Sequence, residues 1–253
     1  MRVLDNAVFI EAHKNNFSSL TRSLSSIKYI VIHYTGNKGD TARNNALYFR
    51  DANIQTSAHF FVSGTDIYQS VNLNHAAFAV GLGSRKEPYF RWPELWKKAN
   101  NNNSVSIEIC GYPNSLEADD ETKRTAAMLA VDLMEKIGLT PSCLCRHYDI
   151  TGKCCPAWAV NDPLKWLDFK LLVTNMFYGK EEDEMLIDSP ENYSVFKTFM
   201  DRWLAEQDAK PMEAWETPGM TYCEQYGLIR DGKPKGIVTR SQLATVLMRL
   251  DKK

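Results

Sequence analysis

The sequence lacks any long apolar run, any excess of charge of one sign, and any internal repeat or low-complexity segment. A bilayer-spanning helix needs about 20 consecutive apolar residues, so we expect no membrane segment. The 30 basic and 31 acidic side chains nearly cancel, so we expect no nucleic-acid partner. The first residues, MRVLDNAVFIEAHKNN, include acids where a secretory signal would be apolar, which predicts synthesis in a cytoplasm without a signal peptide.

Cysteine, by contrast, is present six times, at positions 110, 143, 145, 154, 155 and 223. Thiols stay reduced in a cytoplasm, so clustered cysteines indicate metal binding or catalysis rather than a disulfide framework. The densest cluster is the segment RHYDITGKCCP at 146–156, where a histidine, a lysine and two adjacent cysteines precede a proline. Because so many potential metal ligands lie in one segment, we predict that a further ligand comes from elsewhere in the chain.

The order of strand and helix patterns predicts an α/β domain. The β-branched run IKYIVIHYTG, from residue 27, predicts a buried strand, and further strands are predicted within 57–71 and at 104–110. Helices are predicted at 40–53, 117–138 and about 162–177. Strands interleaved with helices favour a central mixed β-sheet flanked by helices.

The charged segment GKEEDEMLIDSP at 179–190 predicts a linker. We therefore assign residues 1–178 to the α/β domain and residues 191–253 to a small all-α C-terminal domain with three helical patterns. So small a module has little core of its own. An alternative is that its helices pack on the first domain or form a contact between copies of the chain, giving a homo-oligomer.

The cysteine-rich segment and the end of the strand that carries His33 together suggest a catalytic zinc site, which needs three protein ligands and one open position. His147 and Cys155 lie in what we predict to be one loop. His33, at the C-terminal end of its strand, could supply the third ligand, because ligands bind where the strands of α/β sheets end. Glu108 could take the proton from an attacking water, and Lys153 could donate to the oxyanion.

Three alternatives remain open on these residues alone. The histidines and Glu108 could be ordinary hydrogen-bonded or solvent-facing residues of their strands. The cysteines at 143, 145, 154 and 155 could form a structural four-thiolate zinc site, although they lack paired C-x2-C units. Cys155 could instead be the nucleophile of a Cys–His hydrolase with His147 as its base.

The segments YIVIHYTG, TSAHFFVSGTDIYQSV, SVSIEICG and RHYDITGKCCP resemble, in order and spacing, the zinc-dependent N-acetylmuramoyl-L-alanine amidases of type 2. These enzymes share a fold with peptidoglycan recognition proteins and form the catalytic part of many phage endolysins. The resemblance covers about residues 20–175. It implies that His33, His147 and Cys155 bind one zinc ion per chain, that Glu108 is the catalytic acid/base, and that Lys153 stabilises the transition state.

The chain departs from the pattern of these amidases at two positions. Many relatives have a tyrosine where this chain has Ala58, and a histidine where it has Ala79. The resemblance therefore implies no tyrosine-based mechanism for this chain, and Glu108 is expected to be the more important catalytic residue. His59 is predicted to have a structural role or to support the metal ligands from behind, and His75 to be a solvated side chain.

The expected function is hydrolysis of the amide bond between N-acetylmuramic acid and L-alanine in bacterial peptidoglycan, as in a phage endolysin that lyses cells. Such an enzyme is made in the host cytoplasm and acts on the cell wall after release. The alternative is a non-catalytic peptidoglycan-recognition module, which in relatives lacks the cysteine ligand. The presence of Cys155 favours the enzyme.

The end of the chain, WETPGMTYCEQYGLIRDGKPKGIVTRSQLATVLMRL, is similar to a single shortened copy of the S-layer-homology type of wall-binding motif. Together with its place after a linker, this similarity predicts that residues 191–253 bind the cell wall. Binding by a second module would raise the effective concentration of the first at an insoluble substrate.

Overall fold

The computed structural model describes residues 2–81, 93–111, 115–179, 229–230 and 233–234, and the chain divides into two units, Met1–Lys197 and Thr198–Lys253. Most of the predicted linker and C-terminal domain lies outside the described residues. Of residues 191–253, the described part is a short antiparallel pair, β9 (Ile229–Arg230) and β10 (Lys233–Pro234), which the all-α prediction did not include. In the described part of the chain, no helix has the length and apolar character that a membrane crossing requires.

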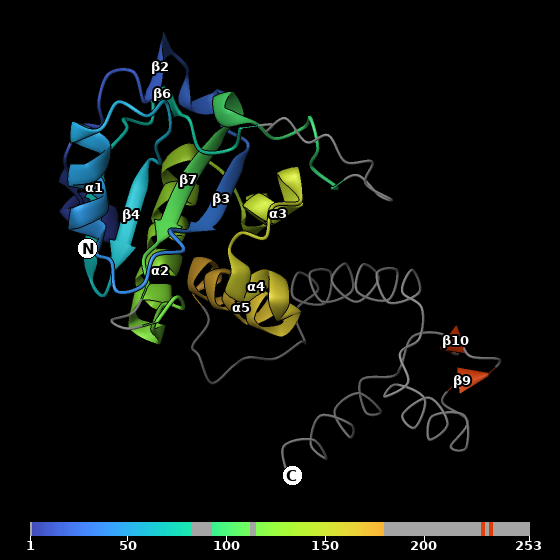
Figure 1. Ribbon diagram of the computed structural model, residues 1–253. Helices are drawn as coiled ribbons and strands as arrows, with labels where there is room; N and C mark the ends of the chain where they lie inside the picture. The colour runs from blue at the N-terminus through green and yellow to red at the C-terminus, as the bar shows by residue number, and fades with distance from the viewer. Residues whose placement is uncertain (1, 82–92, 112–114, 180–228, 231–232, 235–253) are drawn as a thin grey trace. The chain divides into compact units, whose positions relative to one another are not determined.

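A six-stranded mixed sheet, in the order β1-β5-β4-β7-β3-β8, forms the centre of the first unit, and β2 and β6 form a separate antiparallel pair (Figure 1). The strands of this unit are β1 (Val8–Phe9), β2 (Phe17–Thr21), β3 (Tyr29–Tyr34), β4 (Phe60–Ser63), β5 (Asp66–Gln69), β6 (His75–Ala77), β7 (Ser104–Ile109) and β8 (Leu144–Arg146). The α-helices are α1 (Ala42–Asp51), α2 (Asp120–Ile137), α3 (His147–Thr151), α4 (Ala157–Asn161) and α5 (Pro163–Tyr178). Short 3-10 helices cover Val3–Asn6, Leu24–Ser26, Asn101–Asn103 and Pro141–Cys143.

The predicted mixed sheet is confirmed. β3 pairs in parallel with β7 and β8, and β4 also pairs in parallel with β7. β4 and β5 form an antiparallel hairpin, whose turn includes Gly64 with a φ of 54°. Crossover connections are needed for the parallel pairs, and the helices between the strands supply them.

Alternate residues of the central strands enter different hydrophobic clusters, as the two-residue period of a strand requires. Ile30 and Ile32 of β3 belong to the main core, which also contains buried residues of α2 and α5. Val31, between them, packs with Cys145 and Ile150 instead. Both faces of the sheet are therefore covered, which explains why the sequence of β3 is a continuous apolar run.

The main helices begin and end where the sequence predicts, to within three residues. Thr41 caps α1 by accepting a hydrogen bond from the Asn44 N–H at 3.1 Å. Asp119 caps α2 in the same way, and Gly138, with a φ of 82°, ends it. Asp162 caps α5, whose first residue is Pro163.

A close backbone approach joins the segments that follow β3 and β7. The Gly111 N–H donates to the Asp40 carboxylate at 2.8 Å. A Cβ atom at Gly111 would lie 2.8 Å from the Ser115 carbonyl oxygen and closer still to that of Asn37. Real Cβ atoms do not approach backbone oxygens so closely, so only glycine fits this position.

We therefore expect Gly111→Ala to lower the free energy of unfolding by roughly 1–3 kcal/mol, the usual cost of overpacking. Gly81→Ala is the matched control, because a Cβ atom there would meet no atom of the described residues within 4 Å. Denaturant midpoints measure both effects. Equal midpoints for the two variants would show that the segments after β3 and β7 can move apart with little loss of stability.

Candidate metal centre and catalytic groups

His33 is the fifth of the six residues of β3, and 1% of its surface is exposed. The carboxyl ends of the parallel strands β7, β3 and β8 meet at one edge of the sheet, where α/β proteins bind ligands. In the register of β3 and β7, His33 lies directly opposite Glu108. Their side chains consequently share one face of the sheet.

His147 is the first residue of α3, which begins where β8 ends. The prediction of a loop is therefore wrong for residues 147–151. The helix forms because the Asp149 carboxylate accepts a hydrogen bond from the Arg146 N–H at 2.8 Å and so caps it. Gly152, with a φ of 71°, then ends the helix after five residues.

A buried ion pair holds this short helix in place. The Arg146 Nη2 donates to the Asp149 Oδ1 at 2.8 Å, and both side chains are less than 10% exposed. The same guanidinium donates to the Ala159 carbonyl of α4 at 2.7 Å and lies over the rings of Tyr148 and Trp166. The segment that carries two of the predicted metal ligands is thus fixed at both of its ends.

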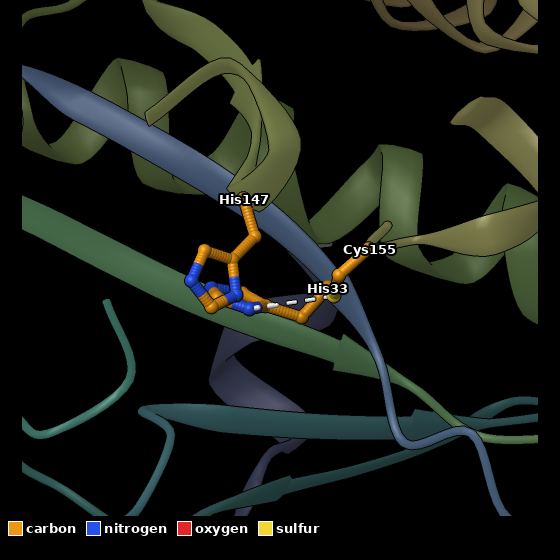
Figure 2. A group of neighbouring side chains, drawn as sticks. All are labelled: His33, His147 and Cys155. Carbon is orange, nitrogen blue, oxygen red and sulfur yellow. Dashed lines mark hydrogen bonds between the residues drawn. The ribbon is translucent and has the colours of Figure 1, made fainter. Parts of the chain in front are cut away.

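Cys155 brings the third predicted ligand to the same point. Its carbonyl accepts a hydrogen bond from the Tyr148 N–H at 2.9 Å, and its Sγ lies 3.9 Å from His33 Nδ1. Figure 2 shows the side chains of His33, His147 and Cys155 converging from β3, α3 and the segment after α3. One ligand atom from each lies within 4.8 Å of the other two.

The protonation of these groups fits a metal ion. Burial, reinforced by His147 and Lys153, lowers the pKa of His33 well below its usual value, so its imidazole is neutral as metal binding requires. The buried His33 Nε2 hydrogen-bonds no protein group within the described residues. Burial also raises the pKa of Cys155 to about 12. A nucleophilic cysteine needs a lowered pKa, so this environment disfavours the Cys–His hydrolase, whereas a metal ion deprotonates a bound thiol directly.

The four-thiolate alternative is wrong, because the structure separates the cysteines. Cys143 packs in the main core, whereas Cys145 belongs to a different cluster and lies 3.7 Å from the Ile30 carbonyl oxygen. Cys154 is exposed, with its Sγ 3.5 Å from the Asn161 side-chain oxygen. None of these three belongs to the group of potential metal ligands found among the described residues.

Glu108 lies beside the ligands on β7. Its Oε1 is 3.9 Å from His33 Nδ1, and 19% of its side chain is exposed. Its Oε2 is buried and bonds no protein group in the described part of the chain. Burial raises the pKa of Glu108 to about 7; Lys153 opposes this shift and Asp40 adds to it. A carboxyl group in this state can both accept and release a proton near neutral pH.

Lys153 lies in the exposed turn between α3 and Cys155. Its N–H donates to the Thr151 hydroxyl at 3.3 Å, and its carbonyl accepts from the Cys155 N–H at 2.7 Å. The positive charge of Lys153 lowers the pKa of both His33 and Glu108. Lys153 therefore acts on the charge of both groups through its own charge.

Two histidines outside the group have structural surroundings. His59 is buried beside Arg22, whose Nη2 lies 2.9 Å from the ring Nε2, and its Nδ1 accepts from the Ser106 N–H at 3.1 Å. Burial, then Arg22, lowers its pKa to about 3, as suits the structural role predicted for it. The prediction of a solvated His75 is wrong: its ring contacts Phe17 edge-on, and its Nδ1 lies 2.9 Å from the Ser18 carbonyl oxygen.

Sequence patterns did not identify Arg22, Arg146 or Asp149. Arg22 also donates to the carbonyls of Leu73, Asn101 and Ser104, far from it in sequence, so no local pattern marks it. The Arg146–Asp149 pair has a local signal, since the two residues flank His147 at a spacing of three. That spacing allows a capping contact once a short helix is considered.

The fold and the site together define an α/β domain with a His-His-Cys group at the carboxyl edge of its sheet. The family model of N-acetylmuramoyl-L-alanine amidases matches residues 23–158. The chain therefore belongs to this amidase family.

Individual relatives agree with this assignment. N-acetylmuramoyl-L-alanine amidase BlyA of Bacillus subtilis (strain 168) is 34% identical over 171 residues, which cover 66% of this chain and 46% of BlyA. CwlL of Bacillus licheniformis is 30% identical over 171 residues, with the same two coverages. The chain thus spans about half the length of these curated relatives. The solved catalytic domain of XlyA matches with a TM-score of 0.53 and 25% identity, over 66% of this chain and 99% of that domain.

The ion pair under α3 gives a stability prediction. Asp149→Asn should lower the free energy of unfolding by roughly 3–5 kcal/mol, because it leaves the Arg146 charge buried without its partner. Asp51→Asn is the matched control, since the Asp51–Arg50 pair is exposed and should contribute nothing measurable. Thermal or denaturant unfolding distinguishes the two. If both variants were equally stable, the buried pair would not be what holds α3.

Proposed function

We propose that this chain is a zinc-dependent amidase that hydrolyses the bond between N-acetylmuramic acid and L-alanine in bacterial peptidoglycan. One observation carries the proposal: His33, His147 and Cys155 converge beside the carboxylate of Glu108 at the carboxyl edge of the sheet. Three such protein ligands with a neighbouring acid/base group are what a zinc hydrolase needs. Membership of the amidase family supports the choice of substrate.

The metal ion would be held by the two imidazoles and the thiolate. Bound there, zinc supplies a Lewis acid that polarises the scissile carbonyl and makes water more acidic. Histidine nitrogen and cysteine sulfur suit zinc better than calcium or magnesium, which prefer oxygen ligands. The neutral His33 imidazole needs no proton loss to serve as a ligand.

Glu108 moves the proton in this mechanism. Its carboxylate accepts a proton from the attacking water, and the same oxygen then gives that proton to the nitrogen of the departing L-alanine. Because the side chain is largely buried, few bulk waters compete for the proton. Lys153, at the rim, offsets the negative charge that develops on the carbonyl oxygen.

The alternative, a non-catalytic peptidoglycan-recognition module, is disfavoured by the residues present. A binding module has no need of a buried acid next to a cluster of metal ligands, and keeping unpaired polar groups buried costs stability. Glu108 and Cys155 are both in place here. We accordingly favour a lytic enzyme of the endolysin type, made in the host cytoplasm and acting on the cell wall after release.

A wall-binding role for residues 191–253 belongs to the same proposal. Its support is the charged segment that precedes them and their similarity to wall-binding repeats. If these residues bind the wall, a fusion of 185–253 to a fluorescent protein should sediment with intact cell walls. A fusion that stays in the supernatant would favour packing on the first domain or a contact between copies.

The bond that is cut tests the function directly. Purified peptidoglycan digested with the full chain should yield stem peptides with a free L-alanine amino terminus, which mass spectrometry detects. Cleavage between sugars, cleavage within the peptide stem, or binding without cleavage would each contradict the proposal.

The ligand assignment predicts that Cys155→Ser loses zinc and activity together, because a neutral hydroxyl replaces a thiolate poorly. Cys154→Ser is the matched control, since the neighbouring thiol is exposed and faces Asn161. Elemental analysis of both purified variants measures zinc per chain. Full zinc occupancy in Cys155→Ser would exclude this thiol as a ligand.

The proton-transfer role predicts that Glu108→Gln keeps its zinc and its stability but loses roughly a hundredfold or more in rate. Glu117→Gln removes a carboxylate from the same domain, one that pairs with Lys165 at 2.9 Å, and should stay fully active. The rate of wall clearing compares the three proteins. Near-normal clearing by Glu108→Gln would mean that another group activates the water.

A further inference from the structure

Three buried polar atoms near the ends of β3 and β7 hydrogen-bond no protein group within the described residues: His33 Nε2, Thr35 Oγ1 and Glu108 Oε2. Unpaired buried polar groups are rare in folded proteins and call for an explanation. The proposed metal site and proton transfer account for His33 and Glu108. Neither accounts for the hydroxyl of Thr35.

Thr35 lies at the site by virtue of the strand register. It comes one step after Tyr34, which is paired with Ile109, and its own N–H still donates to the Ile109 carbonyl at 3.1 Å. The alternation of β3 therefore continues to Thr35 and places its side chain on the face that carries His33 and Glu108. Diagonal neighbours on adjacent strands lie about 7–8 Å apart, a distance that a long side chain such as glutamate can reach across.

Several buried hydroxyl groups of this fold have hydrogen-bond partners, whereas the Thr35 hydroxyl has none among the described residues. The Ser57 hydroxyl donates to the Asn16 carbonyl at 2.6 Å, and the Thr122 hydroxyl accepts from the Gly64 N–H at 2.7 Å. A hydroxyl offers one donor, and a carboxylate offers only acceptors. The unpaired Thr35 Oγ1 and Glu108 Oε2 are thus complementary groups on one face of the sheet.

We propose that Thr35 is a positioning residue for the amidase reaction, whose hydroxyl donates a hydrogen bond to Oε2 of Glu108 in the working enzyme. Catalytic hydrogen bonds are often long in the free enzyme and tighten in the loaded site. The bond would leave Oε1, which lies 3.9 Å from His33 Nδ1, free to accept and release the proton. This inference rests on the function proposed above.

Thr35→Val tests the inference, because valine keeps the shape and removes the hydroxyl. We expect kcat to fall roughly tenfold with KM within about twofold, since the lost bond orients a catalytic group rather than the substrate. Zinc content should not change. The melting temperature should stay level or rise, because the hydroxyl loses no hydrogen bond to any residue that the structure describes. Thr35→Ser, which keeps the hydroxyl, should restore most of kcat.

A double-mutant cycle shows whether Thr35 acts through Glu108. In a Glu108→Gln background, adding Thr35→Val should lower the residual rate no further, because the group that Thr35 positions no longer works. An equal loss in both backgrounds would overturn the inference. So would a kcat of Thr35→Val within twofold of the wild type, or a loss of activity that follows a loss of stability.

Ser70→Ala is the matched control, because the buried Ser70 hydroxyl also has no hydrogen-bond partner in the described part of the chain and follows β5, away from the ligands. It should keep full activity. Failure of the inference and failure of the proposed function give different results. A wild-type chain that releases no L-alanine amino termini contradicts both, whereas an active wild type with an equally active Thr35→Val contradicts the role of Thr35 alone.

Discussion

The parallel pairing of β3 with both β7 and β8 is the constraint on which the site depends. Parallel strands end at the same edge of a sheet, so three segments distant in sequence deliver their next residues to one place. His33 and Glu108 are register partners, and His147 follows directly on the end of β8. A shift of one residue in the pairing would turn the histidine and the acid to opposite faces and abolish the group.

The chemistry proposed for this edge requires polar groups that the fold itself does not satisfy. His33 and Glu108 are largely buried, and each has a side-chain atom that hydrogen-bonds no group among the described residues. Elsewhere the same domain satisfies its buried charges, as the Arg146–Asp149 pair shows. Arg146 and Asp149 therefore hold the site in position, whereas His33 and Glu108 have atoms that are available to a ligand.

Much of the central architecture could be predicted from the sequence, because local patterns determine it. The apolar run of β3, the alternation of β7 and the caps of α2 each have a signal within a few residues. The short elements could not be predicted: β1 has two residues and α3 has five, too few to show a period. The environments of Arg22 and His75 also escaped prediction, since their partners come from distant parts of the chain. The candidate metal ligands could be proposed from the sequence because histidine and cysteine are concentrated in one segment, whereas nothing marks Thr35 until the register of β3 and β7 is known.

X-ray absorption at the zinc edge of the purified full chain tests the central claim most directly. It reports which atoms surround the metal, independently of whether the protein is active. The account predicts one zinc ion bound by two imidazole nitrogens, one sulfur and one further light atom, at about 2.0–2.3 Å. A chain without zinc, or a zinc ion with two or more sulfur neighbours, would contradict it.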